Sequence, residues 1–127
     1  MKILIIDDSA VMRRIHKNIL IEHHVPESDL LEAEDGESAW RLAAANEIGL
    51  FLVDWNMPRM DGFQLVKKIR SDARYAATPI VMITSEAAKY NVVDAINAGV
   101  TNYVVKPIKG DILWTKISKY LGPGGGR

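Results

Sequence analysis

The stretch that decides the fold is Leu50-Phe51-Leu52-Val53-Asp54, four consecutive apolar residues that end in a carboxylate. A continuous apolar run of this length is typical of a parallel strand covered on both faces. Three more runs of this kind occur along the chain. Residues 3–6 precede Asp7 and Asp8, residues 80–83 precede Thr84, and residues 103–105 precede Lys106. Because the carboxyl ends of parallel strands meet at one edge of a sheet, we expect these polar groups to converge.

Stretches with helical spacing separate these runs, and residues 30–33 form a shorter and weaker strand candidate. The apolar positions of the predicted helices are Val11, Met12, Ile15 and Ile19; Ala39, Leu42 and Ala43; Phe63, Val66 and Ile69; Val92, Val93 and Ile96; and Leu113, Ile117 and Leu121. Strand and helix therefore alternate five times. With right-handed crossovers this pattern predicts an α/β fold, a doubly wound parallel sheet of five strands with helices on both faces.

Composition indicates one domain that is neither exported nor bound to nucleic acid or membrane. The 127 residues are 48% hydrophobic, and 16 basic residues balance 16 acidic ones. There is no cysteine, which excludes thiolate metal sites and cysteine nucleophiles and fits a cytoplasmic location. We expect one domain over residues 1–121. The glycine-rich residues 122–127 are expected to form a disordered tail or a remnant of cloning.

The carboxylates at the strand ends predict a divalent cation. Asp54 follows a buried run and precedes Trp55, so its surroundings should be partly dry. Two unit charges about 4 Å apart repel by roughly 4 kcal/mol at an effective dielectric near 20. Asp7 and Asp8 have an ordinary alternative role, since an acidic pair can cap a following helix. All candidate donors are hard oxygens, and Mg²⁺ fits such a donor set best.

Thr84 and Lys106 each have an ordinary explanation when taken singly, as a helix cap and as a lysine that extends to water. Together with the carboxylates, the two side chains suggest a role in binding a phosphoryl group. A phosphorylated Asp54 would need neutralisation of its added charge and a hydroxyl donor, which Lys106 and Thr84 supply. A cis bond before Pro107 is a further hypothesis, because it would direct Lys106 back at the site.

The three histidines are not expected to take part. His16 lies on a predicted helix, and His23 and His24 lie in a polar turn. Solvated side chains are therefore the expectation for all three.

Five motifs resemble those of the receiver domain of two-component response regulators. They are Asp7-Asp8, Val53-Asp54-Trp55-Asn56-Met57-Pro58, Met60-Asp61-Gly62, Ile83-Thr84-Ser85 and Tyr103-Val104-Val105-Lys106-Pro107. The resemblance runs from Met1 to about Leu121 with the motifs in order, and it is greatest to the single-domain regulators of chemotaxis. It implies a flavodoxin-like sheet with the strand order 2-1-3-4-5.

The resemblance also implies how the site works. Asp54 would be the phosphoacceptor, supplied by the phosphohistidine of a histidine kinase, and small phosphodonors would also serve. The ligands of Mg²⁺ would be Asp8, Asp54 and the backbone carbonyl of Asn56, with Asp7 acting through water. Thr84 would then move toward the phosphoryl group and Tyr103 would turn inward behind it. Dephosphorylation would be tuned by Asn56 and Glu86.

By the same resemblance, the output is phosphorylation-dependent binding to the flagellar motor switch. The binding face would comprise Tyr103, Ala87, Val92 and Lys116. An alternative is that Val92 belongs to the core and Lys116 is merely solvated. We expect a monomer that is not an enzyme with turnover and catalyses only its own phosphorylation and dephosphorylation.

Two further alternatives bear on the biological role. The chain could be a receiver excised from a larger regulator, or a phosphorelay intermediate that passes phosphate to another histidine. An aspartyl-phosphate phosphatase belongs to a different class and would need a second acid two residues after the nucleophile. That position is Asn56, so the sequence argues against this class.

Overall fold

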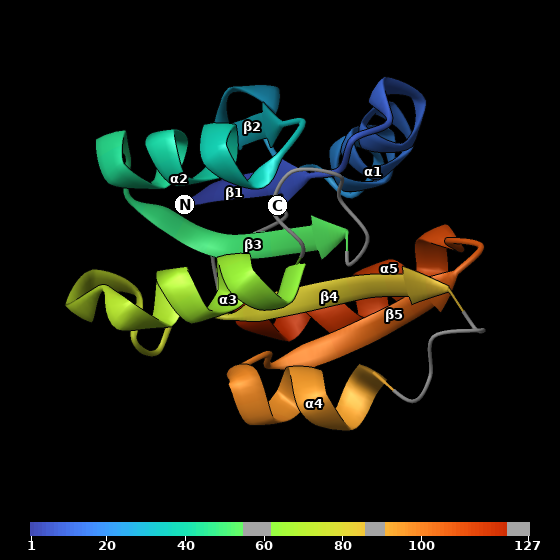
Figure 1. Cartoon of the computed structure of the whole chain (residues 1–127). Coiled ribbons are helices and arrows are strands. Elements are labelled where there is room, and N and C mark those ends of the chain that lie inside the picture. The colour runs from blue at the N-terminus through green and yellow to red at the C-terminus, as the bar shows by residue number, and fades with distance from the viewer. Residues whose placement is uncertain (55–61, 86–90, 122–127) are drawn as a thin grey trace.

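The computed structural model describes residues 1–54, 62–85 and 91–121. Strands and helices alternate along the chain (Figure 1). The strands are β1 (Lys2–Ile6), β2 (Leu30–Ala33), β3 (Ile48–Asp54), β4 (Ile80–Ser85) and β5 (Asn102–Lys106). The α-helices are α1 (Ala10–Glu22), α2 (Gly36–Ala45), α3 (Gly62–Ser71), α4 (Asn91–Ala98) and α5 (Gly110–Ile117). Short 3₁₀ helices are η1 (Glu27–Asp29), η2 (Ala73–Tyr75) and η4 (Ser118–Tyr120).

The five strands form one parallel sheet in the order β2-β1-β3-β4-β5. This topology confirms the predicted doubly wound fold, and the weak strand candidate at residues 30–33 is the edge strand β2. Strand order reverses between β1 and β3. In open parallel sheets, ligands bind beyond the carboxyl ends of the strands at such a point.

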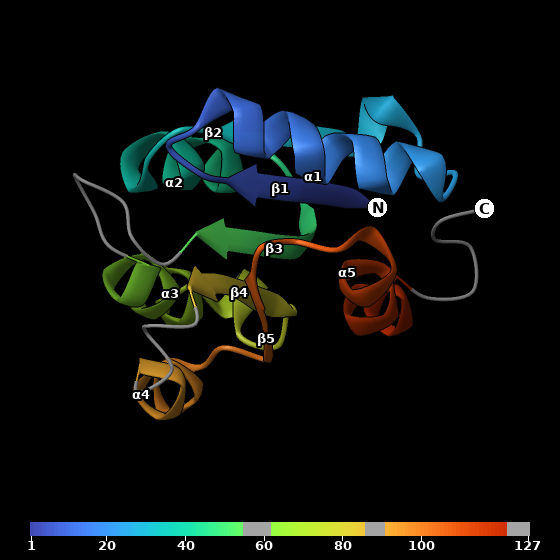
Figure 2. The ribbon, with the colours of Figure 1, turned by 90° about the vertical axis from the view of Figure 1, so that its right-hand side faces the viewer.

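Helices cover both faces of the sheet, which explains why the strands are continuously apolar. One hydrophobic core joins the sheet to α2, α3 and α4, and the other joins it to α1 and α5. Figure 1 shows α2, α3 and α4 in front of the sheet, and Figure 2 shows α5 on the side opposite α3 and α4. Among the described residues, no helix is both long and apolar enough to cross a membrane.

The predicted apolar face of α1 was right at Ile19 and wrong at Val11 and Ile15. Val11 is 69% exposed and Ile15 is also exposed, whereas His16, Ile19 and Leu20 face the core. The helical spacing of Val11 and Ile15 is real, but the buried stripe lies next to it around the helix. Because His16 belongs to the buried stripe, a pattern of apolar residues alone does not reveal that stripe.

The predicted face of α4 was also misplaced. Val93 and Ile96 are exposed, and Ala95 lies in the core. The side chain of Val92 lies outside the described part of the structure. A small residue at the contact allows α4 to pack closely on the sheet and leaves larger apolar side chains facing outward.

Local signals fix where three helices begin or end. Ser9 Oγ accepts from the Met12 amide at 3.2 Å and caps α1. Asp35 and Ser38 form a reciprocal capping box at the start of α2. Gly99 follows α4 with φ of 118°, a left-handed conformation that favours glycine.

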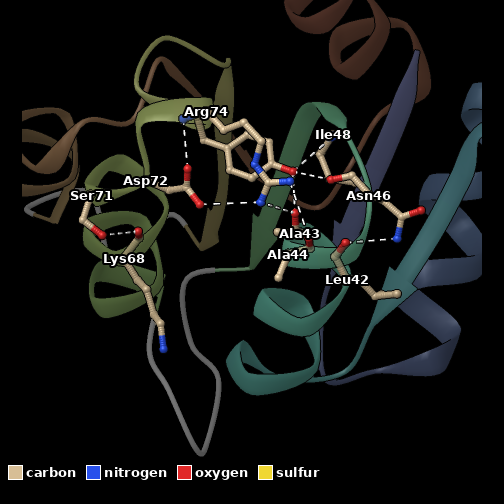
Figure 3. Close-up of polar contacts among 10 residues, drawn as sticks. Leu42, Ala43, Ala44, Asn46, Ile48, Lys68, Ser71, Asp72 and Arg74 are labelled. Atoms are coloured by element: carbon tan, nitrogen blue, oxygen red, sulfur yellow. Dashed lines mark hydrogen bonds and ion pairs between the residues drawn. The ribbon is translucent and has the colours of Figure 1, made fainter.

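The amino edge of the sheet is held by polar contacts around η2. The buried Tyr75 hydroxyl lies 2.6 Å from both Ala43 O and Asn46 O, and it accepts from the Ile48 amide at 3.3 Å. Arg74 adds a bond to Ala43 O at 3.0 Å (Figure 3). These contacts join α2, β3 and η2 at the end of the sheet opposite the predicted site.

Candidate functional site

The polar residues predicted from the strand ends do come together at the carboxyl edge of the sheet. Asp54 ends β3 and is only 3% exposed, while Asp7 follows β1 and is 1% exposed. Thr84 lies near the end of β4 and is also buried, and Lys106 ends β5. In the sheet register, Asp54 pairs with Ile83 and Thr84 pairs with Val105. Parallel pairing therefore brings residues far apart in sequence to one place.

Three carboxylates form a compact cluster with the donor atoms that a hard metal ion requires. One ligand oxygen from each of Asp7, Asp8 and Asp54 lies within 4.8 Å of the others. Asp8 is exposed and the other two are buried, so the cluster opens to solvent on one side. Charges this close repel by several kcal/mol unless a cation offsets them.

The state of Asp7 supports the fit of the cluster to a cation. Its Oδ2 is buried and makes no hydrogen bond in the described part of the structure. Burial raises the pKa of Asp7 to about 6, and the charge of Asp54 adds to that rise, although the Ser9 amide opposes it. A buried carboxylate that clusters with two other acids and has an oxygen without a hydrogen bond to the described residues fits a divalent cation with oxygen ligands.

Lys106 reaches the Asp54 carboxylate directly. Its Nζ lies 3.2 Å from Asp54 Oδ1, and the lysine side chain remains 31% exposed while that of Asp54 is almost fully buried. The Lys106–Pro107 peptide bond is cis, as hypothesised. The ammonium group thus approaches from the solvent side of a carboxylate that lies inside the sheet edge.

The turn between β1 and α1 holds the acidic pair in place. The Ser9 amide donates to Asp7 Oδ1 at 2.9 Å, and the Asp7 amide donates to Ala33 O of β2 at 3.1 Å. Arg13 of α1 also donates to the backbone carbonyl of Asp7. One part of the alternative role is therefore present, because Asp7 accepts from an amide near the helix start, but Ser9 makes the cap itself.

The expectation that all histidines are solvated was wrong for His16. This residue is 1% exposed, and neither ring nitrogen has a hydrogen-bond partner in the described part of the chain. Burial lowers the pKa of His16 to about 4, with a smaller contribution from the charge of Lys106. His23 is half-buried and stacks on Trp114 of α5 at 4.5 Å, whereas His24 is exposed.

Two residues of the predicted output face, Tyr103 and Lys116, lie next to each other. Lys116 Nζ lies 4.7 Å above the ring of the half-buried Tyr103, so α5 and β5 contribute neighbouring side chains. The predictions for Asn56, Glu86 and Ala87 lie outside the described residues, and Val92 is placed in α4 without its side chain.

A family model described as the response regulator receiver domain matches residues 3–118. The chain therefore belongs to the response regulator receiver family. This is a family of signalling receivers and not of classical enzymes. The match includes the acidic pair, the strand-end aspartate, the threonine and the lysine described above.

Relatives and solved structures agree with this assignment. The chain is 46% identical to the chemotaxis protein CheY homolog of Campylobacter jejuni over 127 residues, which cover 99% of this chain and 96% of the relative. It is 48% identical to chemotaxis protein CheY1 of Helicobacter pylori, over 96% of this chain and 98% of the relative. The structure of chemotaxis protein CheY4 of Vibrio cholerae matches with a TM-score of 0.86 at 30% identity, over 94% of this chain and 98% of that one.

Proposed function

We propose that this chain is a signalling switch in which Asp54 accepts a phosphoryl group from the phosphohistidine of a histidine kinase. The observation that carries the proposal is the environment of Asp54. This buried carboxylate lies against the ammonium group of Lys106 on one side and the acids Asp7 and Asp8 on another. An acceptor needs a cation for its added charge and a place for a metal ion, and both are available here.

The acidic cluster fits Mg²⁺ as the metal ion. Asp7, Asp8 and Asp54 offer oxygen ligands within reach of one another, and family resemblance adds the backbone carbonyl of Asn56. When bound, Mg²⁺ would supply positive charge that offsets the carboxylates and the phosphoryl oxygens.

Transfer at this site requires positioning more than acid–base chemistry. A carboxylate oxygen of Asp54 forms a bond to phosphorus while the bond from phosphorus to the donor imidazole nitrogen breaks. The leaving nitrogen keeps the electron pair and takes a proton from solvent. Lys106 Nζ, 3.2 Å from Asp54 Oδ1, neutralises charge that passes from the carboxylate to the phosphoryl oxygens.

Thr84, Lys106 and Tyr103 would respond to the phosphorylated state. The Thr84 hydroxyl would donate to a phosphoryl oxygen, a contact available in only one state, and Tyr103 would turn inward behind it. Such a contact shifts an existing equilibrium by the difference in its energy between the two states. Lys116 lies over Tyr103, so a change in the ring alters the surface of β5 and α5.

The biological setting we propose is chemotaxis, with the flagellar motor switch as the target of the activated protein. The names of the Campylobacter and Helicobacter relatives support this setting, because both are chemotaxis proteins that match almost end to end. The target face would include Tyr103, Lys116, Val92 and Ala87. Dephosphorylation would depend on Asn56 and Glu86.

Phosphate uptake from a small phosphodonor tests the proposal. Intact-mass spectrometry after incubation with acetyl phosphate and Mg²⁺ should show one added phosphoryl group. An Asp54→Asn variant and a sample with chelated Mg²⁺ should show none. Uptake that persists in Asp54→Asn would remove the assignment of the acceptor.

A further inference from the structure

Arg13 links the acidic pair to the neighbouring edge strand. Its Nη1 donates to the backbone oxygen of Asp7 at 2.6 Å, and its Nε donates to Glu32 Oε1 of β2 at 3.0 Å. Lys17, one turn further along α1, holds the other oxygen of Glu32 at 3.2 Å. The guanidinium group therefore bridges the end of β1 and a carboxylate that is itself fixed by a second cation.

We propose that Arg13 is a positioning residue for Mg²⁺, and that its bridge from Glu32 to the backbone of Asp7 sets the geometry of the acidic pair. This inference rests on the proposed function, because it concerns the same metal site. Arg13 would not touch the metal ion. It would act through the peptide unit that joins Asp7 to Asp8.

The placement of the bonds supports a positioning role over a general packing role. The peptide unit between Asp7 and Asp8 carries the bonded carbonyl, so a rotation of this unit would redirect both carboxylates. Within this turn, the Ser9 amide fixes Asp7 Oδ1, and Arg13 fixes the adjacent carbonyl. Residues that orient metal ligands through such hydrogen bonds commonly affect metal affinity by 10- to 100-fold.

The bridge requires two N–H donors held in one rigid plane. A guanidinium group can serve the Asp7 carbonyl and the Glu32 carboxylate at once, whereas an ammonium group on a flexible stem has no such fixed fork. Glu32 is an effective anchor because it stays charged. Burial alone would raise the pKa of Glu32, but hydrogen bonds from Arg13 and Lys17 hold it below its usual value.

If charge alone mattered, loss of Arg13 would have the opposite effect on Mg²⁺ affinity from loss of positioning. Removing a cation near three carboxylates should strengthen their attraction for Mg²⁺. Loss of positioning should weaken binding instead. The matched control is Lys17→Met, which removes a positive charge from the same Glu32 pair without touching Asp7.

The experiment is a Mg²⁺ titration of the full chain followed by amide NMR signals of Asp8 and Ser9, with thermal unfolding of each metal-free variant measured alongside. Arg13→Met should bind Mg²⁺ about 10-fold more weakly than the wild type while still folded at the titration temperature. Lys17→Met should bind as tightly as the wild type or slightly more tightly. Arg13→Lys keeps the charge and should still show weakened binding.

Arg13→Met with unchanged or tighter Mg²⁺ binding would overturn the inference, and so would wild-type affinity in Arg13→Lys. If Arg13→Met does not fold, Arg13→Lys decides by the same criterion. The wild-type titration separates this inference from the proposed function. No saturable Mg²⁺ binding in the wild type would defeat both, whereas normal wild-type binding with no effect of Arg13 would defeat the positioning role alone.

Discussion

Acidification should destabilise this protein through His16. The folded protein buries the neutral imidazole, and burial lowers the pKa of His16 from 6.5 to about 4. Between pH 6.5 and about pH 4, the His16 imidazole therefore binds a proton in the unfolded chain but not in the folded chain. The contribution of the neutral His16 to stability is fully present above pH 6.5 and is lost as the pH falls toward 4.

The size of the effect follows from the shift. Each pKa unit corresponds to about 1.4 kcal/mol, so the complete loss is about 3 kcal/mol. Between about pH 7.5 and about pH 5, protonation of His16 should lower the free energy of unfolding by about 2 kcal/mol. Asp7 acts in the opposite sense, because its pKa is raised to about 6 and its protonation favours the folded state as the pH falls.

The assay compares urea-induced unfolding of the wild type and His16→Leu at the two pH values, without divalent metal. Subtraction removes the contribution of Asp7, which both proteins contain. His16→Leu should lose about 2 kcal/mol less than the wild type on acidification. His24→Asn removes an exposed histidine and should behave as the wild type. Equal losses in the wild type and His16→Leu would refute the reasoning.

Three further predictions concern the two ends of the sheet. Tyr75→Phe removes the hydroxyl between α2 and β3 and should lower the free energy of unfolding by about 1–3 kcal/mol in urea titrations, with unchanged Mg²⁺ affinity. A weaker Mg²⁺ affinity would show that the two ends of the sheet are coupled. Lys106→Met should leave Mg²⁺ binding largely intact while the affinity gained for a target on activation falls; an unchanged gain, measured by calorimetry, would contradict its role. Mg²⁺ and then beryllium fluoride should quench emission from Trp55 over the background of the other tryptophans, and Asp54→Asn should abolish the second step.

Much of the fold could be predicted because the strand pattern is local in the sequence. Continuous apolar runs identify buried parallel strands, and the polar residue after each run marks the same edge of the sheet. This pattern predicts that Asp7, Asp54, Thr84 and Lys106 lie together, and the structure places all four at that edge. Their chemical roles remain predictions.

The parts that escaped prediction depend on tertiary contacts. The buried stripe of α1 passes through His16, a residue that a hydrophobic pattern counts as polar. Its position three residues before Ile19 and four before Leu20 was the available signal. The bridge from Arg13 to Glu32 joins a helix to an edge strand 19 positions away in sequence, and no local motif encodes it.

The most direct test of the switch is an amide NMR comparison of the Mg²⁺-loaded protein before and after addition of beryllium fluoride, which mimics the phosphoryl group on Asp54. We expect changes that extend from Asp54 through Thr84 to Tyr103 in the wild type and are absent from Asp54→Asn. Changes confined to the acidic cluster, or changes that persist in Asp54→Asn, would contradict this expectation.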